Sequence, residues 1–286
     1  MPSWAVTGAS RGIGLEYVRQ LSADARNEVF ALIRSQPNAE LAELVSSRSN
    51  LHTVEADVTD AQSLSRAASE VGKLTGGKLD VLISNACHPG LDLRFRPTSA
   101  FLGKEQELKN EIDACMSVNL LGAIYAINCF LPLIRNGEQK KIIYITSPSG
   151  DSKFTRQCGV TVTVGYSITK AGMNLVMSKY AAELGGEGIK TLSLSPGWVD
   201  TDGSKRLPHI KVSVWETDGT RSLARDMAPT QEVLDMALKV FQKVNPDLTG
   251  LMTPEESVRK QLEVINGLTT EQSGMALSHH GDNNWL

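Results

Sequence analysis

Short apolar segments alternate with amphipathic segments along roughly the first two hundred residues, and this alternation limits the possible folds more than any other feature. The expected strands are rich in β-branched residues and lie at 4–8, 28–33, 51–56, 79–84, 141–146 and 189–194. Their nearly continuous apolar character is typical of strands that are covered on both faces. Strands that alternate with helices require right-handed crossovers. The sequence therefore predicts an α/β fold with a doubly wound parallel sheet.

The pattern weakens after residue 200. Residues 203–249 contain three prolines and one amphipathic segment, 231–244, and we interpret this stretch as an insertion. A capped helix is expected next, with Thr253 at the N-cap, Glu256 at the capping-box position and Gly267 at its end. A last strand within 274–280 would close the sheet. The 286 residues contain no internal repeat, so a single domain is expected.

Composition excludes several classes of partner. A formal net charge of −3 provides no basic field for nucleic acid and no polybasic patch for a membrane. The most apolar stretch, 115–134, is nearly long enough to span a bilayer. It carries Asn119 and Asn128, and we expect a buried helix that ends at Pro132. The start of the sequence lacks the charged region of a signal peptide, so a cytoplasmic location is expected.

The four cysteines are scattered without CxxC spacing, which favours reduced thiols. The pairs Cys87–His88 and His279–His280 each lack a second pair at ligand spacing, so no metal site is expected.

The first expected strand leads into "TGASRGIG", which places Gly8, Gly12 and Gly14 between a strand and a helix. Glycines at such a turn let the backbone approach a pyrophosphate closely, and the helix then offers free N–H groups to the anion. The G-x-x-x-G-x-G spacing differs from the G-x-G-x-x-G of the standard dinucleotide fingerprint. A second motif, "YSITK", places Tyr166 and Lys170 on one helix face, since residues four apart are neighbours there.

Five more segments accompany these two motifs in order: "EADVTD", "SNAC", "SVNLLG", "ITSPSG" and "SPGWVDTD". Together the motifs resemble the short-chain dehydrogenase/reductase family over nearly the whole chain. The resemblance is to its single-domain branch, and within it to sniffer-like carbonyl reductases and fungal norsolorinic acid-type ketoreductases. It implies a Rossmann-type fold, with a cofactor-binding half at about 1–150 and a catalytic and substrate half at about 151–286.

The resemblance also implies site residues. Four match the family's catalytic positions: Asn119, Ser147, Tyr166 and Lys170. The expected cofactor contacts lie in the glycine turn, at the strand ends, in the YxxxK motif and in the segment after the sixth strand: Gly8, Ser10, Arg11, Gly12, Ile13, Gly14, Arg34, Asp57, Val58, Asn85, Ala86, Tyr166, Lys170, Pro196, Gly197, Val199 and Thr201.

The chemistry of carbonyl reduction explains these residue types. A carbonyl that accepts hydride becomes an alkoxide and needs a proton, which Tyr166 would give. The Lys170 ammonium should lower the pKa of that phenol from its usual value near 10. Ser147 would hold the carbonyl oxygen against the Tyr166 hydroxyl. Asn119 would position a water molecule that connects Lys170 to solvent.

Charge at the second strand indicates the cofactor. Enzymes that use NAD usually carry an acidic residue there, to bind the ribose hydroxyls. Here Ile33 stands at that position, Arg34 follows it, and Arg11 lies inside the glycine turn. Two guanidiniums can bind a 2′-phosphate bidentately. We therefore predict NADP(H).

Three departures from the family pattern concern the substrate side. Ser84 and Cys87 replace an Asn and a Gly, and we interpret Cys87 as a small buried side chain in preference to the alternative of a reactive thiol near the nicotinamide. Ser147 and Tyr166 are 19 positions apart, more than is usual, and 151–165 is expected to be a loop that lines the substrate pocket. The insertion at 203–249 is expected to act as a substrate lid.

The predicted function is NADPH-dependent reduction of a small-molecule ketone or aldehyde, possible substrates being aromatic or polyketide-derived. Two alternatives stay open: an epimerase or dehydratase with tightly bound cofactor, and a non-catalytic NADP(H)-binding regulator. The first usually has another glycine spacing and a separate substrate domain. The second commonly lacks the tyrosine or serine, which are present here. By analogy with the family, a homo-oligomer, either dimer or tetramer, is possible.

Overall fold

The structure is a computed structural model and describes residues 1–91, 94–201, 210–212, 225–227 and 231–286. Its strands are β1 (Ser3–Thr7), β2 (Glu28–Ile33), β3 (Leu51–Glu55), β4 (Val81–Ser84), β5 (Lys141–Ile145), β6 (Lys190–Leu194), β7 (Ile210–Val212), β8 (Arg225–Met227) and β9 (Ala276–Leu277). Its α-helices are α1 (Gly12–Leu21), α2 (Ala39–Ser47), α3 (Ala61–Thr75), α4 (Glu105–Cys115), α5 (Ala123–Asn136), α6 (Ser152–Cys158), α7 (Val164–Leu184), α9 (Gln231–Phe241) and α10 (Pro254–Asn266).

One sheet has the strand order β3-β2-β1-β4-β5-β6-β9, and every neighbouring pair in it is parallel. The predicted doubly wound parallel sheet is therefore confirmed. The strand order reverses between β1 and β4, where Ala5 pairs with Leu82. Ligands of open α/β sheets bind beyond the carboxyl ends of the strands at such a switch point. Here those ends are Thr7 of β1 and Ser84 of β4.

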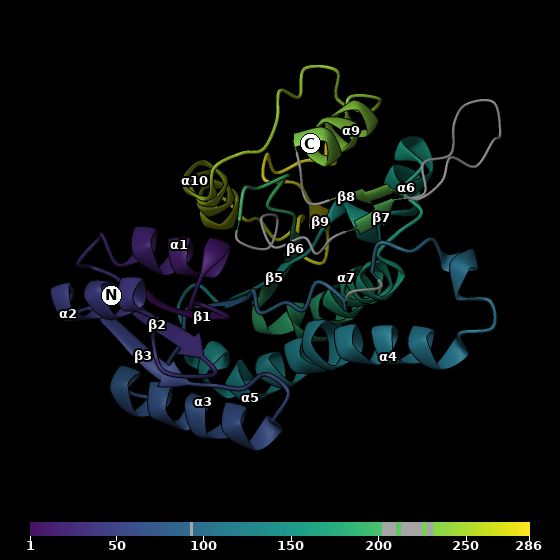
Figure 1. The fold of residues 1–286 in the computed structure, drawn as a ribbon. Coiled ribbons are helices and arrows are strands. Elements are labelled where there is room, and N and C mark those ends of the chain that lie inside the picture. Colours follow the sequence, from purple (N-terminus) through teal and green to yellow (C-terminus); the bar gives the residue numbers. More distant parts are fainter. Residues whose placement is uncertain (92–93, 202–209, 213–224, 228–230) are drawn as a thin grey trace.

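Helices cover both faces of the sheet (Figure 1). On one face, α3, α5 and α7 pack through a hydrophobic cluster that includes Val71, Phe130 and Met173. On the other face, α1, α2 and α10 pack through a second cluster that includes Val18 and Val258. All five residues of β5 are consequently buried, which accounts for its apolar sequence after Lys141.

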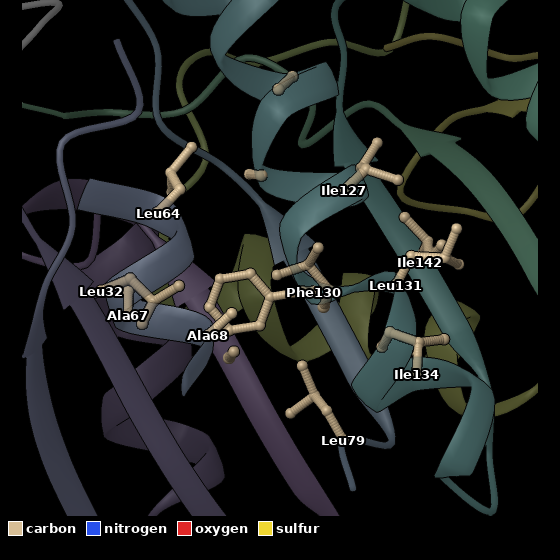
Figure 2. Close-up of a cluster of buried hydrophobic side chains, with 14 of the residues drawn as sticks. Leu32, Leu64, Ala67, Ala68, Leu79, Ile127, Phe130, Leu131, Ile134 and Ile142 are labelled. Carbon is tan, nitrogen blue, oxygen red and sulfur yellow. The ribbon is translucent and has the colours of Figure 1, made fainter. Parts of the chain in front are cut away.

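The first cluster joins α3 and α5 to the sheet (Figure 2). Figure 2 shows the ring of Phe130 reaching from α5 toward Ala67 and Ala68 of α3. Leu32 of β2 and Ile142 of β5 belong to the same cluster. Full burial of an aliphatic or aromatic side chain of this size contributes about 1.5–3 kcal/mol to stability. The small alanines of α3 leave room for the ring between the two helices.

The stretch Glu105–Asn136 is one helical run, made of α4, a π-helical segment at Met116–Gly122, and α5. By length and composition alone it could cross a membrane. However, Phe130 and Ile134 are fully buried against α3 and the sheet, so α5 is the core helix that was predicted. The predicted end at Pro132 is wrong. A proline removes one backbone hydrogen bond, and burial of Ile134 holds the next turn in place.

Helix α10 begins and ends as its sequence predicts. Thr253 Oγ1 accepts a hydrogen bond from the Glu256 N–H at 3.1 Å, Pro254 is the first helical residue, and Gly267 follows the last. Strand β9 then pairs with β6 and closes the sheet.

The prediction of a loop at 151–165 is wrong in part, because Ser152–Cys158 form α6. Asp151 caps the N-terminus of α6, and Gly159, with a φ of 68°, ends it in the left-handed region. These two local signals, a capping carboxylate and a glycine seven residues beyond the first helical position, were present in the sequence.

A third hydrophobic cluster joins α6 to distant segments. Phe154 of α6 packs against Phe241 of α9 at a ring-centroid distance of 5.8 Å, and Phe241 meets Trp198 edge-on at 5.2 Å. Trp285 belongs to the same cluster, and its Nε1–H donates to Asp151 Oδ2 at 2.7 Å. The cluster therefore binds α6 and α9 to the segment that follows β6.

The insertion predicted at 203–249 is described only in part. Strands β7 and β8 pair with each other in antiparallel fashion, and α9 confirms the amphipathic helix expected at 231–244, with a slightly earlier end. Residues 203–209, 213–224 and 228–230 lie outside the described residues, and part of the predicted lid falls there.

His279 follows β9 and is 2% exposed. Its ring lies against Gly197, where a Cβ would be 2.8 Å from His279 Cε1. Neither ring nitrogen has a hydrogen-bond partner within the described ranges. Burial, assisted by the positive charges of His280 and Lys260 and opposed by Asp282 and Glu256, lowers the pKa of His279 to about 4.

Stability should therefore fall on mild acidification. The unfolded state binds a proton at His279 near pH 6.5, whereas the folded state binds it only near pH 4. The contribution of His279 to the free energy of unfolding is therefore fully present above pH 6.5 and is lost as the pH falls from 6.5 to 4. The expected loss is on the order of 3 kcal/mol. Urea unfolding at about pH 7 and about pH 4.5 would measure it, and His279→Asn should remove most of the difference. The exposed neighbour His280→Asn serves as the control. Equal pH dependence in wild type and His279→Asn would contradict the assignment.

Candidate active site

The turn between β1 and α1 leaves no room for a side chain at Gly8 or Gly14. Gly8 and Gly12 have φ values of 66° and 56°, which favour glycine. A Cβ on Gly8 would lie 2.8 Å from Ala86 Cα. A Cβ on Gly14 would overlap the Gly8 carbonyl oxygen and lie 2.5 Å from Asn85 Nδ2. Because α1 begins at Gly12, its free N–H groups and the positive end of its dipole lie at this turn.

Thr7 fixes the segment after β4 against the turn. Its Oγ1 accepts hydrogen bonds from the N–H groups of Asn85 at 2.9 Å and Ala86 at 3.0 Å. Asn85 Nδ2 in return donates to the carbonyl oxygens of Thr7 at 3.0 Å and Gly8 at 3.3 Å. The structure thus brings Asn85 and Ala86 to the switch point of the sheet. Thr7 was missed by the sequence analysis. Its signal was a hydroxyl at the end of a strand that is buried on both faces.

The end of β2 lies against the same turn. Asn38 Nδ2 donates to the carbonyl oxygen of Ser10 at 2.8 Å, which ties the segment after β2 to the turn. Arg11 and Arg34 are both exposed, one on the turn and one directly after β2. Ile13 is partly buried and packs against the second hydrophobic cluster. Two guanidiniums are therefore exposed on adjoining segments.

Asp57 and Val58 follow β3. Burial opposes ionisation of Asp57, but hydrogen bonds from Thr59 and the charge of Arg34 hold its pKa below the usual value. Thr59 donates to Asp57 Oδ1 through its N–H at 2.9 Å and its hydroxyl at 2.7 Å. Val58 is half-buried, and its carbonyl oxygen lies 2.9 Å from where a Cβ on Gly122 would stand. The Asp57 carboxylate is thus fixed at the sheet edge within the field of Arg34.

The segment after β6 packs against α10 and against the residue His279, which follows β9. Ser257 Oγ donates to the carbonyl oxygen of Pro196 at 2.7 Å. Gly197, with a φ of 81°, lies against the His279 ring, which leaves no space for a side chain.

The same segment returns toward the glycine turn. Val199 forms an isolated parallel bridge with Met252. A Cβ on Gly12 would lie 3.8 Å from Thr201, so the two segments are neighbours. The structure therefore brings Pro196–Thr201 to the same end of the sheet as the glycine turn.

The four predicted catalytic residues come from three elements. Asn119 lies in the π-helical segment, Ser147 follows β5, and Tyr166 and Lys170 lie one turn apart in α7. Gly150 lets the segment after β5 pack closely against α7, because a Cβ on Gly150 would lie 3.1 Å from Lys170 Cβ. Ser147 lies near enough to the Tyr166 hydroxyl to lower the pKa of that phenol.

Lys170 is 2% exposed, and its ammonium is enclosed by aromatic rings. Its Nζ donates to the carbonyl oxygen of Ile145 at 2.6 Å. It lies 4.6 Å from the ring centroid of Tyr144 and 5.3 Å from that of Tyr166. Both distances fall within the range of cation–π attraction. Tyr144 is a second residue missed by the sequence analysis, since a tyrosine in an apolar strand indicates only core packing.

The electrostatics of Tyr166 differ from the expectation that Lys170 sets its pKa below 10. Burial raises the pKa of Tyr166 to about 12, although the Lys170 charge and the nearby Ser147 hydroxyl both lower it. Desolvation outweighs the ammonium here because the phenolate would lose its hydration shell. The phenol is consequently protonated at neutral pH.

Asn119 is fully buried and its side chain is engaged on both sides. Oδ1 accepts from the N–H of His88 at 2.6 Å, and Nδ2 donates to the His88 carbonyl oxygen at 2.9 Å and to Thr169 Oγ1 at 3.1 Å. The amide therefore joins the segment after β4 to α7. The predicted role of Asn119 in positioning water stays a prediction.

The interpretation of Cys87 as a buried side chain is wrong, because the thiol is exposed. Burial ends at Ser84, the last residue of β4, and three residues later the chain has left the sheet. A negative charge on Cys87 would raise the pKa of Tyr166, so the thiol faces the same site.

Comparison with known proteins identifies the family. The model of the short chain dehydrogenase family matches residues 4–210. The chain belongs to the short-chain dehydrogenase/reductase family. It is 75% identical over 286 residues to the short-chain dehydrogenase/reductase atnB of an Arthrinium species, with 100% of each chain covered. The NADPH-bound carbonyl reductase from chicken fatty liver superposes with a TM-score of 0.72 at 26% identity, over 99% of this chain and 98% of that one. The carbonyl reductase Sniffer of D. melanogaster shares the fold, with a TM-score of 0.70 at 20% identity over 99% of this chain and 98% of that one.

This short-chain dehydrogenase is thus an oxidoreductase of a family that uses a nicotinamide dinucleotide. The residues present fit such a group. The crowding around Gly8 and Gly14 lets backbone alone face a pyrophosphate, and exposed Arg11 and Arg34 stand on adjoining segments. When bound, the nicotinamide would supply the hydride.

Gly14→Ala should damage both folding and cofactor binding. The added methyl would overlap the Gly8 carbonyl oxygen, so the turn must shift, at a cost of about 1–3 kcal/mol in unfolding free energy. Affinity for a reduced nicotinamide dinucleotide, followed by its fluorescence, should fall at least about tenfold because the turn that would face the phosphates is displaced. Gly186→Ala is the matched control, since a Cβ there meets nothing within 4 Å. Equal unfolding free energies and equal cofactor affinities in the two variants would contradict the crowding inferred at Gly14.

Proposed function

We propose that this short-chain dehydrogenase reduces a ketone or aldehyde to an alcohol with NADPH, reversibly. The observation that carries the proposal is the buried Lys170 ammonium, 5.3 Å from the ring centroid of Tyr166, with the Ser147 hydroxyl near the same phenol. A buried charge beside a phenol and a hydroxyl supplies the groups that polarise a carbonyl and protonate the resulting oxygen.

In this proposal Tyr166 is the general acid. Its raised pKa keeps the proton on the phenol at neutral pH, and the alkoxide formed during reduction is a far stronger base. Ser147 orients the carbonyl oxygen toward the Tyr166 hydroxyl. The Lys170 charge favours the phenolate that remains after proton transfer. Asn119 holds the segment after β4 in place through its bonds to His88.

The choice of NADP(H) over NAD(H) is supported by charge. Arg11 and Arg34 are exposed beside the turn, and Ile33 stands where an acidic residue would bind the ribose hydroxyls. Asp57 is the nearby carboxylate, and its Oδ1 is already engaged by Thr59. The remaining proposed cofactor contacts are those whose positions are given above: Gly8, Ser10, Gly12, Ile13, Gly14, Val58, Asn85, Ala86, Pro196, Gly197, Val199 and Thr201.

The substrate class that we propose is an apolar, aromatic ketone, such as one derived from a polyketide. The third hydrophobic cluster supports it, because Trp198 directly follows Gly197 and packs against Phe241, which in turn packs against Phe154. The insertion 203–249, which includes α9, would act as the substrate lid. In this scheme the cofactor-binding half is 1–150 and the substrate half is 151–286.

We further propose a cytoplasmic homo-oligomer, dimer or tetramer. Leu121 of the π-helical segment and Ile168 and Leu175 of α7 are exposed apolar side chains, which supports pairing of these helices between copies of the chain.

Tyr166→Phe should remove turnover and leave NADPH binding intact, because the variant loses only the proton donor. We expect kcat to fall at least about a thousandfold. Loss of NADPH absorbance with a panel of aliphatic, quinone and polycyclic aromatic ketones would measure it, with fluorescence titration of NADPH in parallel. Near-normal turnover in this variant would contradict the proposed role of Tyr166.

Arg34→Asp should shift the cofactor preference toward NADH. The variant removes a cation from the proposed 2′-phosphate site and adds a charge that repels phosphate, so the ratio of kcat/KM for NADPH to that for NADH should fall about a hundredfold or more. Arg26→Asp, another exposed arginine, which pairs with Asp24 away from the turn, is the control. An unchanged ratio in Arg34→Asp would refute the proposed phosphate site.

A further inference from the structure

Tyr144 is the least expected side chain of β5. The strand reads KIIYI, and Tyr144 is 1% exposed on the face that carries α5 and α7. A buried phenol needs a hydrogen-bond partner. The hydroxyl of Tyr144 donates to the backbone carbonyl oxygen of Asn119 at 3.2 Å. The polar end of the ring is therefore bonded to the π-helical segment. Tyr144 itself lies three residues before Ser147 in the chain.

The face of the same ring meets the Lys170 ammonium. Lys170 Nζ lies 4.6 Å from the ring centroid of Tyr144, and the carbonyl that accepts its hydrogen bond belongs to Ile145, the next residue along β5. On the other side, the ring of Tyr166 is 5.3 Å away. One buried charge thus has two aromatic rings and one backbone oxygen as its described surroundings. A desolvated ammonium is attracted to such ring faces.

We propose that Tyr144 is a positioning residue of this site: its ring holds the Lys170 ammonium beside Tyr166, and its hydroxyl anchors that ring to the Asn119 carbonyl. The catalytic part of this inference rests on the proposed carbonyl reductase function, while the positioning part does not. Tyr144 acts through Lys170 and takes no part in proton transfer.

The surrounding groups favour a neutral Tyr144. Burial, assisted by Cys87, raises the pKa of its phenol well above the usual value, so the hydroxyl remains a donor to Asn119. The titratable groups that face Tyr166 are Lys170, Cys87 and Tyr144, and Cys115 at the end of α4 also lies within the field of Lys170. None of these except Lys170 is cationic. The ammonium is therefore the one positive charge among them, and its location decides how strongly it acts on the Tyr166 oxygen.

Three substitutions separate the ring from the space it fills. Tyr144→Met removes the ring and keeps an apolar side chain of similar length, and Tyr144→Phe keeps the ring and loses the hydroxyl. Tyr180→Met is the matched control. Tyr180 lies on α7, ten residues after Lys170, and belongs to the same hydrophobic cluster. It is 9% exposed, and its hydroxyl donates to Asn128 Oδ1 at 2.7 Å.

The first measurement is the NMR spectrum of protein labelled with ¹⁵N and ¹³C at lysine. In wild type, one side-chain resonance should be displaced by the ring currents of two aromatic rings, and its absence from Lys170→Met would assign it. We expect Tyr144→Met to move this resonance toward the position of the exposed lysines, and Tyr144→Phe and Tyr180→Met to leave it in place. An unmoved resonance in Tyr144→Met would overturn the positioning role.

The second measurement is kinetic, with a polycyclic aromatic quinone that wild type reduces. We expect Tyr144→Met to lower kcat about tenfold with NADPH affinity unchanged, and Tyr144→Phe to lower it less than about threefold. Tyr180→Met should lower the melting temperature and leave kcat near that of wild type. If Tyr144→Met behaves as Tyr180→Met does, the residue is structural only and the inference is wrong. A wild type that reduces no carbonyl would contradict the proposed function, and the lysine resonance would still decide the positioning.

Discussion

The buried Lys170 ammonium is the constraint around which the site is arranged. Removing a charge from water is costly unless other groups replace its solvation. Here the replacement comes from a strand carbonyl and from the rings of Tyr144 and Tyr166. The carbonyl of Ile145 and the ring of Tyr144 depend on the register of α7 against β5, because both belong to that strand, whereas Tyr166 lies one turn from Lys170 on α7 itself. The packing of α7 on the sheet is therefore a condition for the chemistry and not only for stability.

Hydrogen bonds also connect α7 to the glycine turn, at the other end of the site. Asn119 joins the segment after β4 to α7 through His88 and Thr169, and Thr7 joins that segment to the glycine turn. These bonds connect the segments that lie next to the carboxyl ends of β1, β4 and β5. The proposed cofactor side and the proposed catalytic side are thus parts of one connected framework.

Much of this arrangement could be predicted from the sequence, because its causes are local. The strands are continuous apolar runs, α10 has a capping box at Thr253, and the positions of Ser147, Tyr166 and Lys170 follow from motif spacing. The rest depends on tertiary contacts. Pro132 stays inside α5 because of what Ile134 packs against, Cys87 is exposed because the chain leaves the sheet before it, and Tyr144 is identified only once Lys170 is seen on its ring. The pKa of Tyr166 also depends on burial, which spacing along a helix does not report.

The third hydrophobic cluster has a consequence for how this protein can change over evolutionary time. Phe154, Phe241 and Trp285 pack with one another beyond the carboxyl ends of the strands, separately from the two clusters that hold the sheet together. Substitutions there can reshape the region next to Trp198 while the sheet and the Lys170 environment keep their own supports. If the substrate binds there as we propose, a lineage can explore new substrate shapes in this way while the sheet keeps its own core.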